Sequence, residues 1–73
     1  MPKLPNLSAL EVVKALGRMG YEFSRRRGSH IILVNREKRR IAVVPNRKEI
    51  PKGTLRAIIR EASVTVEEFL SFL

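Results

Sequence analysis

Apolar residues recur at helical spacing in the first third of the chain and at strand spacing in its middle. Over residues 10–19, beginning with Leu10, the apolar positions lie three or four residues apart, which predicts one core-facing side of a helix. Ser8 and Glu11 form a capping-box pattern that predicts the helix start, and Gly20 suits the left-handed residue after a last turn. Residues 1–6 contain two prolines and no periodicity, so we expect an extended leader.

Three short segments in the middle of the chain have the pattern of strands. Residues 21–27 alternate apolar and polar positions before turning basic, while 30–35 and 40–44 are rich in Ile, Leu and Val and bounded by polar residues. Gly28-Ser29 supplies a turn between the first two, and residues 36–39 have the length of a hairpin link. The tight connections predict an antiparallel sheet.

Two helices follow the strands. Pro45 stops the third strand, and Pro51 suits the first turn of a helix, where its missing N–H has no consequence. Thr65 and Glu68 form a second capping box, ahead of a short closing helix. The apolar face of the second helix comprises Leu55, Ile58, Ile59 and Ala62. The fold class we expect is therefore α+β, with two layers in a single domain over residues 1–73.

Charge narrows the class of partner. Fifteen Lys and Arg against seven acidic residues give a formal net charge of +8, and twelve of the basic residues lie between residues 24 and 60 with only two Glu. Such a concentration in a small domain favours a polyanion, above all nucleic acid, over a basic surface that only confers solubility. The candidates for contacting RNA phosphates are Arg25, Arg26, Arg27, Arg47, Lys48, Lys52 and Arg56.

Composition also excludes several kinds of chemistry. The chain has no Cys, no Asp and one His, which rules out disulfides, thiolate metal sites and a serine-centred triad. Its acidic residues are scattered Glu, so we expect no metal and no small-molecule cofactor. No apolar run approaches a membrane span and no signal peptide is evident, so we expect a cytoplasmic protein without a membrane partner.

His30 is the side chain best suited to acid–base chemistry near neutral pH. Gly28 and Ser29 directly before it allow close approach of a ligand, and three arginines beside it add positive field. These groups could hold an RNA phosphodiester against the imidazole while the 2′-OH of the RNA attacks the adjacent phosphate. A structural or merely exposed histidine is the competing interpretation, and because both strand faces are apolar the sequence leaves open which one is covered.

A series of short motifs follows one another along nearly the whole chain. They are Lys3-Leu4-Pro5, Leu16-Gly17-Arg18-Met19-Gly20-Tyr21-Glu22, Arg27-Gly28-Ser29-His30, Ala42-Val43-Val44-Pro45, Lys48-Glu49-Ile50, the run from Lys52 to Ala62 that opens Lys-Gly-Thr-Leu-Arg, and Val66-Glu67-Glu68-Phe69. In order and spacing these motifs resemble the HicA family of toxins, small mRNA-cleaving proteins with a fold related to the double-stranded-RNA-binding domain.

The resemblance implies a function. It makes His30 the catalytic residue of a metal-independent endoribonuclease, with Gly28 and Ser29 shaping its pocket, mRNA as substrate, and a HicB-type antitoxin covering the site. Many members carry a second histidine in the loop after Val-Pro, where this chain has Asn46-Arg47. Two alternatives stay open: a non-catalytic double-stranded-RNA-binding module on the same fold, and an inactive toxin relic that acts only as an interaction protein.

Overall fold

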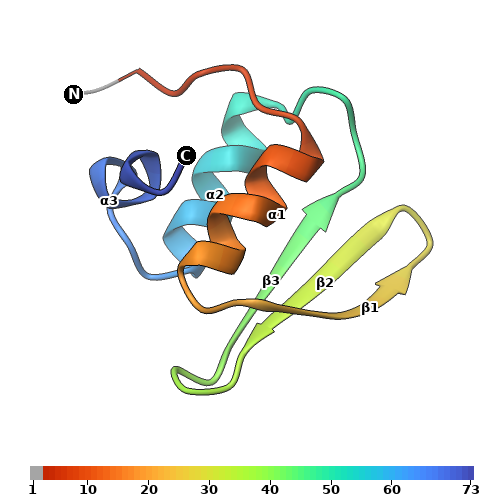
Figure 1. Ribbon diagram of the computed structural model, residues 1–73. Coiled ribbons are helices and arrows are strands. Elements are labelled where there is room, and N and C mark those ends of the chain that lie inside the picture. The colour runs from red at the N-terminus through yellow and green to blue at the C-terminus, as the bar shows by residue number, and fades with distance from the viewer. Residues whose placement is uncertain (1–2) are drawn as a thin grey trace.

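In the computed structural model, which describes residues 3–73, six elements follow one another and the helices lie on one side of a three-stranded sheet (Figure 1). The predicted α+β class is confirmed, and the arrangement is compatible with the double-stranded-RNA-binding-domain-like fold. No helix within the described residues is long and apolar enough to cross a membrane. The elements are α1 (Ala9–Arg18), β1 (Glu22–Arg27), β2 (His30–Asn35), β3 (Arg40–Pro45), α2 (Lys52–Glu61) and α3 (Val66–Ser71).

The first capping box fixes the start of α1 as predicted. The Ser8 N–H donates to Glu11 Oε1 at 3.0 Å, and the Glu11 N–H donates to Ser8 Oγ at 3.2 Å. Hydrogen bonds to the Glu11 carboxylate, first from the Ser8 backbone N–H and then from the Ser8 side chain, lower the pKa of Glu11. Because the pKa of Glu11 is lower in the folded state, its ionised carboxylate stabilises the fold fully at pH values above the unfolded-state pKa. This stabilisation is lost as the pH falls through the folded-state pKa.

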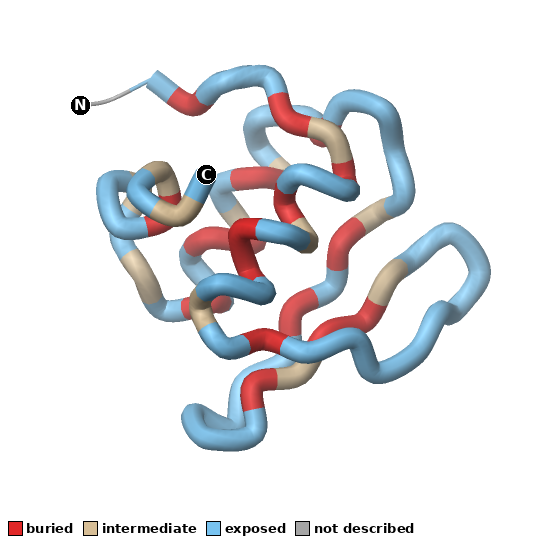
Figure 2. The backbone as a smooth tube through the Cα atoms, in the orientation of Figure 1, coloured by how far each residue is buried: buried red, intermediate tan, exposed pale blue. Residues whose placement is uncertain are grey.

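One residue of the predicted apolar stripe of α1 lies outside the core. Val12, Ala15 and Leu16 are buried, but Leu10 is 62% exposed. The reason is that the helices cover mainly β3, and the hairpin of β1 and β2 extends beyond them (Figure 2). Leu10 therefore borders an uncovered hollow that Phe23 of β1 also lines.

The sheet has the order β1-β2-β3 with both pairs antiparallel. Leu33 of β2 pairs with Ala42 of β3, both are buried, and both belong to the core beneath the helices. The alternate residues of the two strands, His30 among them, belong to the other face of the sheet, which no helix covers (Figure 1). We call this uncovered side of the sheet the open face. The sequence alone could not show which of the two faces it would be.

A β-bulge in β1 decides where its arginines point. The pairing with β2 shifts between Phe23 and Arg25, so Ser24 is an extra residue in the ladder. After the shift Arg25 pairs with Ile32 and Arg27 pairs with His30, which puts both arginines on the open face, while Arg26 lies on the helix side. Strict alternation from Phe23 onward would have placed only Arg26 on the open face.

The ends of several elements differ slightly from expectation. β1 begins at Glu22 rather than residue 21, and β3 includes Pro45, which an edge strand tolerates. The predicted leader begins with Met1 and Pro2, which lie outside the described residues. From Lys3 to Asn6 it forms no helix or strand, and Leu4 anchors it to the core, as does Leu7 directly after it.

Candidate active site

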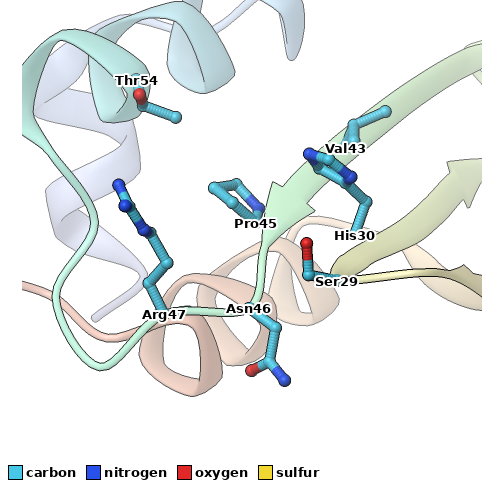
Figure 3. Close-up of a pocket in the computed structure, with 7 residues that line it drawn as sticks. All are labelled: Ser29, His30, Val43, Pro45, Asn46, Arg47 and Thr54. Atoms are coloured by element: carbon cyan, nitrogen blue, oxygen red, sulfur yellow. The ribbon is translucent and has the colours of Figure 1, made fainter.

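A hollow of about 530 Å³ surrounds His30 at one end of the open face. The lining residues come from the β1–β2 turn, β2, β3, the loop after β3 and the start of α2, so the site joins segments far apart in the sequence (Figure 3). We call it the His30 hollow. Its lining comprises Ser29, His30, Val43, Pro45, Asn46, Arg47 and Thr54.

The turn that carries Ser29 and His30 is held on both sides. Gly28 has a φ of +59°, a left-handed conformation that favours glycine, and it allows the tight connection between β1 and β2. The Asn46 N–H donates to the Ser29 carbonyl at 2.7 Å, which ties this turn to the end of β3. His30 itself is exposed, so its imidazole is accessible from solvent.

Arg47 enters the hollow from a loop that is anchored to the start of α1. The Ala9 N–H donates to the Arg47 carbonyl at 2.9 Å, and the Ile50 N–H donates to the Leu7 carbonyl at 2.7 Å. With its backbone held in this way, Arg47 extends its guanidinium towards Thr54 of α2, with Pro45 between it and the imidazole (Figure 3). An imidazole, a guanidinium and a hydroxyl thus line one hollow.

The residue before Arg47 behaves differently. The Asn46 side chain points away from Arg47 and Thr54 (Figure 3), and Asn46 also borders the hollow beside Phe23 on the helix side of the sheet. Both Asn46 and Arg47 line the His30 hollow, but Arg47 is the one whose side chain points towards Thr54. Sequence reasoning missed Thr54, since nothing in the pattern of α2 indicates which flank faces the strands.

The other predicted phosphate contacts divide between four places, of which three are on the sheet and in the loop after it. Arg25 and Arg27 share the open face with His30, and Arg27 is its direct cross-strand neighbour. Arg26 lies on the helix side of the sheet beside Leu10 and Phe23. Lys48 is exposed in the loop after Arg47.

Lys52 and Arg56 lie on the far flank of α2 from the His30 hollow. Each is two residues from Thr54, which is more than half a turn around a helix of 3.6 residues per turn. The ammonium of Lys52 donates to the Leu4 carbonyl and thereby holds the segment before α1. The structure thus brings Arg47, Arg25 and Arg27 to the side of His30 and leaves the basic row of α2 elsewhere.

The positive charge is almost unpaired. Among residues 3–73 the one ion pair joins Arg36 to Glu22 at 3.8 Å, and both side chains are exposed. In the same range no three His, Cys, Asp or Glu side chains gather in a way that could hold a metal ion. The exposed cations therefore sum into a positive field that attracts anions.

The fold and the site together define a small α+β domain with an accessible histidine in a hollow that an arginine also lines. The family model described as "HicA toxin of bacterial toxin-antitoxin" matches residues 9–64, more than half of the chain. The chain belongs to the HicA toxin family, and it is thus the toxin of a toxin–antitoxin pair with an antitoxin as partner. The match includes His30, Arg47 and Thr54 and ends before α3. No curated protein matches the chain closely enough to count as a relative.

Proposed function

We propose that residues 1–73 form a single HicA-like domain that acts as a metal-independent endoribonuclease on mRNA and is neutralised by a HicB-type antitoxin. The observation that carries the proposal is the His30 hollow, where an accessible imidazole and an arginine line the same open cavity. Cleavage of a long transcript by the purified chain, compared with a folded His30→Ala variant, tests it.

The proposed reaction needs only proton movement and charge stabilisation. The 2′-oxygen of one nucleotide bonds to the adjacent phosphorus and loses its proton, while the bond from phosphorus to the 5′-oxygen of the next nucleotide breaks and that oxygen gains a proton. His30 is the general acid/base for one of these transfers, and with a single imidazole in the hollow, water carries the other. Gly28 and Ser29 shape the pocket that receives the phosphodiester.

Arg47 is suited to hold the reacting phosphate. Its planar guanidinium can donate two parallel hydrogen bonds to phosphate oxygens, and this charge offsets the negative charge that grows on the phosphorane. In the loop where many family members carry a second histidine, this chain thus has no imidazole but supplies the guanidinium of Arg47. Arg25 and Arg27 continue the positive field along the open face.

Salt dependence separates the two basic surfaces. Replacing Arg25, Arg27 and Arg47 with Gln should reduce the slope of log affinity against log salt by about 0.7 for each phosphate of single-stranded RNA that is no longer neutralised. Replacing Lys52 and Arg56 with Gln should reduce it less, since Lys52 is engaged by the Leu4 carbonyl. Fluorescence anisotropy with 2′-O-methylated RNA, which cannot be cleaved, gives both slopes. If the Lys52 and Arg56 replacements reduced the salt slope more, the RNA would bind on the flank of α2 that faces away from the His30 hollow, which would contradict this proposal.

Antitoxin binding should bury His30. An acidic partner that covers the hollow blocks access of the RNA and matches the charge of the open face. Because His30 is the only histidine of the chain, acylation by a histidine-selective reagent followed by mass spectrometry reports on this site alone. We expect the acylation rate to fall in the complex together with RNA cleavage. An inhibited complex in which His30 reacts at the free rate would show that the antitoxin binds elsewhere.

A further inference from the structure

The end of the open face opposite to His30 has a second basic hollow. Its volume is about 520 Å³, and it lies where β2 and β3 are joined by residues 36–39. We call it the Arg39 hollow. The side chains that matter for the argument below are Ser24, Val34, Arg36, Arg39, Arg40 and Ile41, all of which border it.

The turn that carries this hollow is held by a buried polar side chain. Asn35 is 4% exposed; its Nδ2 donates to the Met19 carbonyl at 3.4 Å, and its Oδ1 accepts the Lys38 N–H at 3.0 Å. A polar side chain so deeply buried is retained where its hydrogen bonds fix a local structure. The turn is therefore pre-organised rather than a loose link.

Arg39 has a backbone conformation that arginine rarely adopts. Its φ is +55°, in the left-handed region where glycine or asparagine is preferred and where other residues are strained. Such strain is typical of positions where the side chain serves a function. Arg39 lies within five residues that also contain Arg36, Lys38 and Arg40, against Glu37 in the turn and Glu22 beside Arg36.

The surface between the two hollows is apolar, and its β3 side is exposed. Ile41 is 59% exposed and Val43 is 45% exposed, and the register places them beside Val34 and Ile32 on the open face. From His30 to Asn35 the strand covers roughly 16 Å at about 3.3 Å per residue. A few nucleotides of extended single-stranded RNA could span this distance, with sugars and bases over the aliphatic floor.

We propose that the Arg39 hollow is a second phosphate-binding site for single-stranded RNA, so that a bound strand crosses the open face from His30 to the β2–β3 turn. RNA rather than an acidic protein segment is the occupant we favour, because cations at both ends of one apolar floor match the repeating charge of a nucleic acid backbone. This inference rests on the proposed function, because the path of the RNA begins at His30 only if His30 binds the phosphate that is cleaved. No Phe, Tyr or Trp side chain of β2 or β3 faces the floor between the hollows, so binding here should depend little on base identity.

The test compares RNA length with charge removal. Arg36→Gln combined with Arg39→Asn removes two positive charges, and asparagine tolerates the positive φ, so the turn should keep its fold. Lys14→Gln combined with Arg60→Gln removes the same charge from exposed helix positions and is the matched control. The probes are 2′-O-methylated oligouridylates of about two and about twelve nucleotides, since the shorter one falls short of the distance between the hollows and only the longer one can reach both.

We expect the Arg36/Arg39 variant to lower the salt slope of the long probe by about 1.4, which is about 0.7 for each of two phosphates, and to leave that of the short probe unchanged. The control variant should change neither slope. Equal effects of the two variants, or equal effects on the two probes, would overturn the site. Weakened antitoxin binding with an unchanged RNA slope would overturn it as well. Because the probes cannot be cleaved, failure of the nuclease proposal in a cleavage assay is a separate result.

Discussion

Replacing His30 with alanine is expected to slow RNA cleavage by about 10²–10⁴-fold, the usual effect of removing a general acid/base. The fifteen Lys and Arg side chains remain, so affinity for 2′-O-methylated RNA should barely change. His30 is exposed on the open face and lies outside the core, so the variant should also keep its fold. Cleavage rates, anisotropy and circular dichroism measured on the same preparations separate the three effects.

The same variant separates the proposed enzyme from its alternatives. A double-stranded-RNA-binding module or an inactive relic does not use the imidazole, so neither predicts a change in growth arrest when His30 is replaced. An endoribonuclease predicts that cells which stop growing with the wild-type chain tolerate His30→Ala. A folded His30→Ala protein that cuts RNA at the wild-type rate would remove His30 from the mechanism and favour the binding module.

Replacing Phe69 with alanine is expected to reduce the free energy of unfolding by about 3–5 kcal/mol, the range for a fully buried phenylalanine. Phe69 is 0% exposed and is the buried residue through which the short helix α3 joins the core. Domains of this size have a total stability of about 5–15 kcal/mol, so the variant should lose a large share of it. Urea denaturation followed by circular dichroism measures the change.

Phe23 offers a matched control for that substitution. It is 63% exposed at the uncovered hollow beside Leu10, so Phe23→Ala should change stability by no more than about 0.5 kcal/mol, as surface substitutions usually do. Similar destabilisation in the two variants would mean that α3 does not pack as described. The comparison also matters for activity, because an unfolded chain loses its His30 hollow without any change to its chemistry.

Features set by neighbouring residues were predictable from the sequence. Both capping boxes, at Ser8 and Thr65, form as their local patterns predict. The strand from His30 to Asn35 has the predicted bounds, because a short apolar run between polar residues is a local signal. Gly28 adopts the positive φ that its place in a tight turn favours.

Features set by packing between distant segments were not predictable. The covered face of β2 depends on where α1 and α2 dock, and Leu10 is exposed because the helices leave β1 uncovered. The bulge that brings Arg25 and Arg27 to the side of His30 changes the alternation without leaving a pattern in the sequence. Thr54 joins the site through tertiary structure alone.

The chemistry of the cut ends tests the central claim most directly. A long transcript is incubated with wild-type protein in EDTA, and the termini of the fragments are analysed beside a reaction with folded His30→Ala. Attack by the 2′-OH, assisted by His30, predicts 2′,3′-cyclic phosphate and 5′-hydroxyl ends from the wild type and almost no fragments from the variant. Fragments with 3′-hydroxyl and 5′-phosphate ends, or cleavage that EDTA abolishes, would contradict a metal-independent reaction at His30.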